Sequence, residues 1–274
     1  MSGYDETRVL AANRAAGMTA SPPPLSWPGM LSSPPESAGL LDPSGVPFRE
    51  VILDEGHLEA SRIIGHDVTD ARAKSYDILR THVLQSMDLH NWHLLGITSP
   101  TKACGKTLTS INLAFSISRQ MERAVLLIDM DFRKPQLASR LGVTADVGLL
   151  DVLYGRVPAT EAMFEVHAGR HSIVAMPTDP TDVSAELIAS RTMQAFIQQL
   201  RRDFRSYVVI LDLPPMLVSD DVTALLPQID CALLVAAVGT STVPEIEECG
   251  RHLQSTNLVR VVVNKVPESG KMYY

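Results

Sequence analysis

The sequence predicts an α/β fold in which a doubly wound, mostly parallel sheet carries helices on both faces. Short aliphatic runs alternate with amphipathic helical segments along the chain, as strands and helices do in such folds. Two of the runs, 124–128 and 207–211, are apolar throughout, which is typical of central parallel strands covered on both sides. A third run, 92–98, leads into Gly105-Lys106-Thr107, which has the form of the end of a phosphate-binding loop.

Composition limits the kind of protein this is. The chain has 274 residues, a net charge of −7 and 45% hydrophobic residues, enough for one α/β domain with extra segments. The acidic balance argues against nucleic acid as a partner. The three cysteines and eight histidines form no convincing metal-binding set. No apolar run reaches the roughly 18 residues of a membrane span, and no signal pattern begins the chain, so a soluble, cytoplasmic protein is expected.

The first 47 residues are expected to form a disordered, Pro-rich tail. Eight of the 18 prolines fall here among Ser, Gly and Ala, and too little apolar surface is available to offset the entropy of ordering. A proline-rich docking segment is the alternative to a plain linker. We place the folded domain at 48–266, with a short strand at 50–53, and a flexible tail that carries tyrosines at 267–274.

The first half of the domain is organised around the loop. Apolar residues that recur every three and four positions from Asp70 predict a helix that ends near His90-Asn91. After the loop, a largely buried helix is expected over 108–119. The strand 124–128 then ends in Asp129-Met130-Asp131-Phe132-Arg133, and two acids and an arginine at the carboxyl end of a buried strand indicate a functional site.

The second half of the domain completes the predicted sheet. Residues 134–170 are expected to hold short helical and turn segments, and one long helix is expected from about Ser184. The run from Tyr207 to Asp212 has the form of a Walker B strand, with Asp212 placed to hold Mg²⁺. The other expected elements are strands at 171–177, 231–238 and 258–263, the last two buried, and a helix over 243–254.

Polar residues gather at the carboxyl ends of these strands, where doubly wound sheets bind ligands. Lys106 is placed to bind the β/γ-phosphates of ATP, and Thr107 to ligate Mg²⁺. The residues expected at these ends are Thr107, Asp129, Asp131, Asp212 and Asn264. Strand, loop, helix and Walker B strand together predict a fold of the P-loop NTPase type.

The motifs together resemble the bacterial tyrosine autokinases of capsule and exopolysaccharide synthesis, the BY-kinase family, which lies within the P-loop ATPases that carry a second aspartate motif. The resemblance covers roughly residues 70 to 274. It rests on Asp129-x-Asp131-x-Arg133 after one strand and on Asp212-Leu213-Pro214-Pro215 after another. The stretch from Ala185 to Met193 also matches a Glu-Leu-Leu-x-Ser segment of the family.

The resemblance implies catalytic roles for the matching residues. Lys106 would bind the β/γ-phosphates, and Thr107, Asp129 and Asp212 would hold Mg²⁺. Asp129 would sit beside the γ-phosphate, where it orients the metal or accepts the tyrosine proton, and Asp131 would assist it.

Further roles follow from the same resemblance. Asn264 would hydrogen-bond adenine, and Tyr273 and Tyr274 would accept the phosphate. The nucleotide loop would comprise Thr101, Lys102, Ala103, Cys104, Gly105, Lys106, Thr107 and Leu108.

The family also implies an activity, partners and a place in the cell. The chain would be an ATP-dependent protein-tyrosine autokinase with ATPase activity that regulates polysaccharide synthesis or export. Its partners would be a membrane-embedded polysaccharide co-polymerase that acts as a chain-length adaptor, further copies of the chain for trans-phosphorylation, and a tyrosine phosphatase. The adaptor would hold it at the inner face of the membrane.

Two stretches depart from the family pattern. Lys102-Ala103 replaces the usual Pro-Gly of the loop, and a left-handed backbone at Ala103 would cost roughly 1 kcal/mol. Lys102 either adds a second positive charge near the phosphates or is a solvated loop lysine. The helix before the first core strand reads Lys74 to Arg80 where the family has Glu-x-x-Arg-x-x-Arg, so that only Arg80 is retained from the motif that builds a ring.

Two other functions share part of this pattern. One is a nucleotide switch of the partitioning or septum-positioning type, which hydrolyses ATP and phosphorylates nothing. The absence of its signature lysine at Thr101 and the terminal Tyr273-Tyr274 both argue against it. The other is a degenerate scaffold that binds nucleotide weakly; Lys102-Ala103 motivates that hypothesis, and the intact lysine and aspartates oppose it.

Overall fold

The computed structural model describes residues 48–267, except 183 and 219–220, and all of them belong to one unit of the chain. The predicted tail over residues 1–47 lies outside the described residues, and so do Tyr273 and Tyr274. The boundaries placed at 47 and 267 therefore stay predictions.

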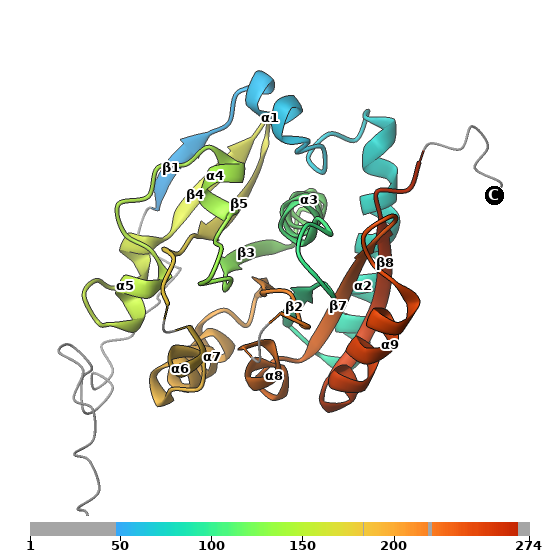
Figure 1. Ribbon diagram of the computed structural model, residues 1–274. Coiled ribbons are helices and arrows are strands. Elements are labelled where there is room, and N and C mark those ends of the chain that lie inside the picture. Colours follow the sequence, from blue (N-terminus) through green and yellow to red (C-terminus); the bar gives the residue numbers. More distant parts are fainter. Residues whose placement is uncertain (1–47, 183, 219–220, 268–274) are drawn as a thin grey trace, which may run out of the picture. The chain divides into compact units, whose positions relative to one another are not determined.

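One eight-stranded sheet runs through the domain in the order β1-β4-β5-β3-β6-β2-β7-β8 (Figure 1). Every neighbouring pair is parallel except β4 and β5, which form an antiparallel hairpin. The predicted doubly wound, mostly parallel sheet is confirmed. The strands are β1 (Arg49–Ile52), β2 (Leu94–Thr98), β3 (Ala124–Asp129), β4 (Phe164–Ala168), β5 (His171–Met176), β6 (Tyr207–Asp212), β7 (Cys231–Ala237) and β8 (Asn257–Asn264).

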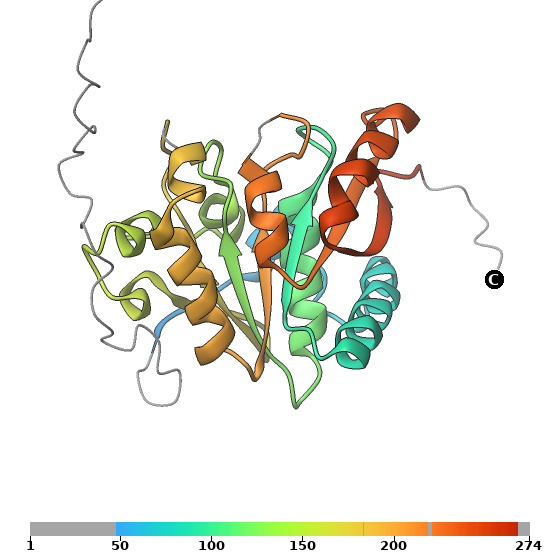
Figure 2. The same ribbon diagram turned by 90° about the horizontal axis from the view of Figure 1, so that it is seen from below.

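Helices cover both faces of the sheet, as Figures 1 and 2 show. One buried apolar cluster joins the sheet to α1–α4, and a second joins its other face to α5–α9. Cover on both sides explains why β3 is aliphatic from Ala124 to Ile128 and β6 from Val208 to Leu211. The helices are α1 (Glu55–Ser61), α2 (Lys74–His90), α3 (Lys106–Ser118), α4 (Leu137–Leu141), α5 (Leu149–Leu153), α6 (Ser184–Ile188), α7 (Arg191–Asp203), α8 (Asp221–Leu225) and α9 (Val243–His252).

Two predictions about helices and strands were wrong. The long helix expected from Ser184 is interrupted: Ser190 is extended, and its hydroxyl accepts a hydrogen bond from the Met193 backbone N–H, so it caps a new helix, α7. The segment 134–170 contains a strand besides turns and short helices. Phe164, Val166 and Ala168 alternate with more exposed residues in β4, which pairs with β5 as a hairpin.

The prediction of a buried strand near the C-terminus was also wrong. β8 is the last strand of the sheet order, and its apolar side chains stay partly exposed, with Val263 at 54% and Leu258 at 41%. An aliphatic run shows that a segment favours a strand, but it does not show whether that strand lies at the centre or at an edge.

Asp77 of α2 joins this helix to α3 through side-chain contacts within the chain. Its carboxylate accepts two hydrogen bonds from the Arg119 guanidinium, at 2.8 and 3.1 Å, and one from the Ser116 hydroxyl, at 2.8 Å. Arg80 donates to the same carboxylate at 3.2 Å and to the Ser116 carbonyl at 2.9 Å. Asp77 and Arg80 therefore join α2 to α3 within one chain.

The part of the chain that the structure describes holds no helix long and apolar enough to cross a membrane.

Candidate functional site

Three neighbouring strands bring the predicted site residues together. β2, β6 and β3 lie side by side and are parallel, so their carboxyl ends share one edge of the sheet. The register places Asp129 opposite Asp212, and Asp212 opposite Ile97 just before the loop. The loop then enters α3, whose first residues are Lys106 and Thr107. A helix N-terminus at this edge favours the binding of anions.

The loop has the backbone expected of a tight anion cradle, with alanine at one left-handed position. Ala103 has φ 63° and Gly105 has φ 92°. The left-handed conformation considered for Ala103 is therefore present, at a cost of roughly 1 kcal/mol for a residue with a Cβ. Gly105 also meets a close neighbour, because a Cβ there would lie 2.2 Å from Asn264 Nδ2.

Asn264 supports the loop from the end of β8. Its Nδ2 donates to the Cys104 carbonyl at 3.0 Å, and its Oδ1 accepts from the Lys265 backbone N–H at 2.8 Å. Its side chain also lines the cleft described below. Adenine binding by Asn264 stays a prediction, and the contacts present give it a second task, which is to hold the loop backbone.

Lys106 lies between two aspartates. Its Nζ is 2.9 Å from Asp131 Oδ2 and 3.7 Å from Asp212 Oδ2. Burial alone would lower the pKa of Lys106, but the charges of Asp212 and Asp131 raise it above the usual value. The ammonium therefore keeps its positive charge at the point where phosphates would bind.

Thr107 and Asp212 form the pair expected of a magnesium site. The Thr107 hydroxyl donates to Asp212 Oδ2 at 2.6 Å, and the Ser110 hydroxyl donates to Asp212 Oδ1 at 3.2 Å. Asp212 is fully buried, and burial raises the pKa of its carboxyl. A hydroxyl and a carboxylate at the foot of a phosphate loop are the oxygen ligands that Mg²⁺ takes in such sites.

Asp129 is placed differently from Asp131. Both of its carboxylate oxygens accept backbone N–H groups, those of Asp131, Gln136 and Leu137, at 2.9–3.0 Å. Burial, and then the charge of Asp212, raise the pKa of Asp129 to about 7. Asp129 is not among the side chains that line the cleft, whereas Asp131 is. The first aspartate holds the turn that presents the second.

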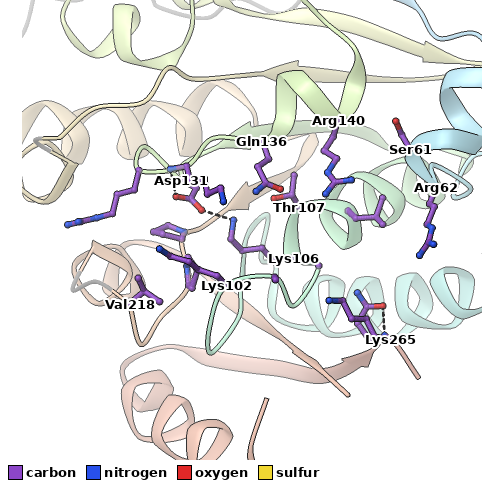
Figure 3. Close-up of a pocket in the computed structure, with 18 of the residues that line it drawn as sticks. Ser61, Arg62, Lys102, Lys106, Thr107, Asp131, Gln136, Arg140, Val218 and Lys265 are labelled. Carbon is purple, nitrogen blue, oxygen red and sulfur yellow. Dashed lines mark hydrogen bonds and ion pairs between the residues drawn. The ribbon is translucent and has the colours of Figure 1, made fainter. Parts of the chain in front are cut away.

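A cleft of about 640 Å³ opens above these residues (Figure 3). Its lining is strongly cationic, although the chain as a whole is acidic. Asp131 is the one acid among the described lining residues, against seven bases: Arg62, Lys102, Lys106, Arg133, Lys134, Arg140 and Lys265. Such a concentration of positive charge is what a polyphosphate ligand requires.

Some of the predicted loop residues line the cleft and others do not. Lys102, Ala103 and Leu108 line the cleft with the Gly-Lys-Thr residues, and Lys102 is exposed at the lining. Thr101 and Cys104 do not line it. The Cys104 thiol is buried and lies 3.4 Å from the Ser241 hydroxyl instead.

One wall of the cleft was missed by sequence reasoning. Ala60, Ser61 and Arg62 at the end of α1 line the cleft, where Figure 3 labels Ser61 and Arg62; no element was predicted between residue 53 and Asp70. Asn112 of α3 holds this segment: its Oδ1 accepts from the N–H groups of Ile64 and Gly65 at 2.7 and 2.8 Å, and its Nδ2 donates to the Arg62 carbonyl at 3.0 Å. A buried asparagine in the helix after the loop was the available signal.

Comparison with known proteins agrees with this geometry. Residues 95–273 match the family described as the CobQ/CobB/MinD/ParA nucleotide-binding domain. EpsB of Ralstonia nicotianae, named as a tyrosine-protein kinase, is 30% identical over 235 residues, which are 83% of this chain and 31% of that protein. The tyrosine-protein kinase CpsD of Streptococcus pneumoniae is 28% identical over 204 residues, which are 72% of this chain and 86% of that protein.

Solved structures show the same fold. The kinase domain of the Escherichia coli tyrosine kinase ETK superposes with a TM-score of 0.68 at 23% identity, over 82% of this chain and 92% of that one. The chain spans less than a third of the length of EpsB, so the comparison concerns one part of that protein. The chain belongs to the CobQ/CobB/MinD/ParA family of nucleotide-binding domains, and its curated relatives include bacterial tyrosine kinases, as its motifs indicated.

Proposed function

We propose that the chain is an ATP-dependent protein-tyrosine kinase that phosphorylates Tyr273 and Tyr274 in the tails of other copies of itself. The observation that carries the proposal is the cationic cleft lined by Lys106, Thr107 and Asp131, with the buried Asp212 carboxylate directly behind Thr107. Relatives named tyrosine kinases support phosphoryl transfer to tyrosine over the switch and the scaffold.

The residues fit Mg²⁺-ATP by their chemistry. Lys106 and the cations on the cleft walls would bind the phosphates, and Thr107 and Asp212 would hold the metal. Bound Mg²⁺ supplies neutralisation of the charge that develops on the phosphates. Since Lys106 now pairs with Asp131 at 2.9 Å, arrival of the phosphates would draw the ammonium away and release that carboxylate.

We assign proton acceptance from the tyrosine hydroxyl to Asp131 rather than to Asp129. Asp131 lines the cleft, whereas both carboxylate oxygens of Asp129 already accept hydrogen bonds from backbone N–H groups. Asp129 is then a positioning residue, since it accepts a hydrogen bond from the Asp131 backbone and holds the turn around it. A role for Asp129 at the metal would require it to give up these contacts.

The biological setting is part of the proposal. By its resemblance to the capsule and exopolysaccharide autokinases, the chain would regulate polysaccharide synthesis or export. It would act at the inner face of the membrane with a membrane-embedded co-polymerase adaptor, and a tyrosine phosphatase would reverse its phosphorylation.

The full chain incubated with Mg²⁺-ATP tests the activity. We expect phosphotyrosine on Tyr273 and Tyr274 by immunoblot and mass spectrometry, and its loss in Lys106→Met and in the double variant Tyr273→Phe/Tyr274→Phe. Arg156→Met, an exposed arginine outside the cleft that pairs with Asp151, is the matched control and should keep the signal.

Two results would replace the proposal. Release of ADP without phosphotyrosine, with or without the adaptor's cytoplasmic segment, would identify a nucleotide switch. Binding of ATP with neither product would identify a scaffold.

A further inference from the structure

Three side chains that can ligate a metal lie together on β1 and β4, outside the cleft. One ligand atom from each of Glu50, Glu165 and His167 lies within 4.8 Å of the other two. Strand register brings them together, because Glu50 is directly opposite Glu165 in the parallel pair. His167 follows two residues later in β4 and therefore shares the same face. The group was invisible in the sequence because Glu50 and Glu165 are far apart along the chain.

The two glutamates concentrate negative charge at the edge of the sheet. Like charges directly opposite each other on neighbouring strands repel and weaken the pairing. Glu165 Oε1 lies 3.8 Å from His167 Nε2, a separation that forms an ion pair only when the imidazole is protonated. A cation between the carboxylates would convert their repulsion into attraction.

The imidazole of His167 has a nitrogen free to bind a metal. Its Nε2 atom is buried, although 28% of the side chain is exposed, and within the described part of the chain this atom makes no hydrogen bond. Glu165 is already oriented, since the Ser172 hydroxyl of β5 donates to its Oε1 at 2.8 Å. Ser172 lies opposite His167 in the β4–β5 hairpin, so it stands where the supporting hydrogen bond of a metal ligand is usually found.

We propose that Glu50, Glu165 and His167 bind a first-row divalent transition metal, for which Zn²⁺ is the probe. One imidazole nitrogen with two carboxylates suits such an ion, whereas Mg²⁺ prefers oxygen ligands alone. Three protein ligands leave a coordination position for water or a further ligand. The ion would fasten β1, an edge strand of four residues, to β4. This site is independent of the nucleotide chemistry proposed above.

Equilibrium dialysis of the untagged full chain against Zn²⁺ in excess Mg²⁺ tests the site. We expect the wild type to hold one Zn²⁺ more per chain than Glu165→Gln or His167→Gln. Ser172→Ala should weaken the same ion by about 10- to 100-fold, as the loss of an outer hydrogen bond does elsewhere. Co²⁺ bound to the wild type should give visible absorption bands that His167→Gln lacks.

Matched variants separate ligation from damage to the fold. His171→Gln removes a histidine that pairs with Ala168 and so faces the other side of the same hairpin; it should leave Zn²⁺ binding unchanged. Glu50→Gln should raise the melting temperature in EDTA, where it relieves repulsion, and lower it relative to wild type in Zn²⁺. Equal Zn²⁺ binding by wild type, Glu165→Gln and His167→Gln, or equal loss in His171→Gln, would overturn the proposal.

Discussion

Two residues of the loop, Ala103 and Gly105, determine the backbone conformation of the candidate site. Ala103 takes a left-handed backbone that favours glycine, and Gly105 leaves room for the Asn264 amide. The loop keeps this shape because Asn264 binds its backbone from β8, and because α3 begins directly after it. Strain at one residue is thus balanced by contacts from another element.

Replacing Ala103 by glycine is expected to stabilise the protein. Removal of the Cβ relieves the left-handed strain, which we expect to raise the free energy of unfolding by about 1 kcal/mol in urea denaturation. The control is Ala73→Gly, since Ala73 is buried with φ −68° and glycine there should destabilise. Equal losses in both variants would show that Ala103 carries no strain.

Loss of the Asn264 amide is expected to weaken nucleotide binding. Asn264→Ala removes a hydrogen bond worth about 1 kcal/mol, so a fluorescent ADP analogue should bind roughly fivefold more weakly. Asn257→Ala, at the other end of β8, removes a similar bond to the Asp230 carbonyl at 2.9 Å and should leave the affinity unchanged. Similar affinities in the two variants would mean that the loop does not depend on Asn264.

At the scale of helices and strands, the Asp77 carboxylate pairs with two partly buried arginines, Arg80 and Arg119, where α2 packs on α3. Asp77→Ala would leave Arg80 and Arg119 half-buried without their carboxylate, and we expect a loss of about 1–3 kcal/mol in the free energy of unfolding. Asp88→Ala on the same helix removes an exposed pair with Arg123 and should cost about 0–1 kcal/mol. A smaller effect at Asp77 than at Asp88 would contradict this account.

Elements whose signals are local were predicted well, and those decided by neighbours were not. β3, β6 and α2 followed from apolar runs and helical spacing, and their bounds lie within a few residues of those expected. β4 was missed although Phe164, Val166 and Ala168 alternate with polar residues in the sequence, because five residues are a short signal and the pairing with β5 is seen only in the fold. The split between α6 and α7 depends on one serine cap, and the exposure of β8 on its place at the sheet edge.

At the scale of the whole molecule, the motifs located the site but not its walls. Lys106, Thr107, Asp131 and Asp212 were expected together, and the structure places them in contact. The cations of the walls come from segments far apart in sequence, such as Arg62, Arg140 and Lys265. No local pattern marks them, because only the folded chain brings α1, α4 and the end of β8 around one cleft.

Buried acids make the stability of the whole chain depend on pH. The pKa of Asp129 is raised to about 7, so its contribution is full below about pH 4, the ordinary range of an unfolded aspartate, and is lost as pH rises through 7. We expect the free energy of unfolding of the metal-free protein to fall between about pH 4 and 7 in urea denaturation. The slope should be flatter in Asp129→Asn, even if that variant is less stable throughout; an unchanged slope would assign the effect elsewhere.

The hydrogen bonds of Asn112 hold one wall of the cleft, the segment 54–65, against α3. Gly65 lies so close to α3 that a Cβ there would come within 2.1 Å of the Asn112 carbonyl, and one amide fixes the turn that carries Arg62. Residues 54–65 therefore pack on α3 through the side chain of Asn112 and contribute no strand to the sheet. Exchanging this segment between related proteins is expected to change which ligand the cleft prefers while the loop and its aspartates stay unaltered.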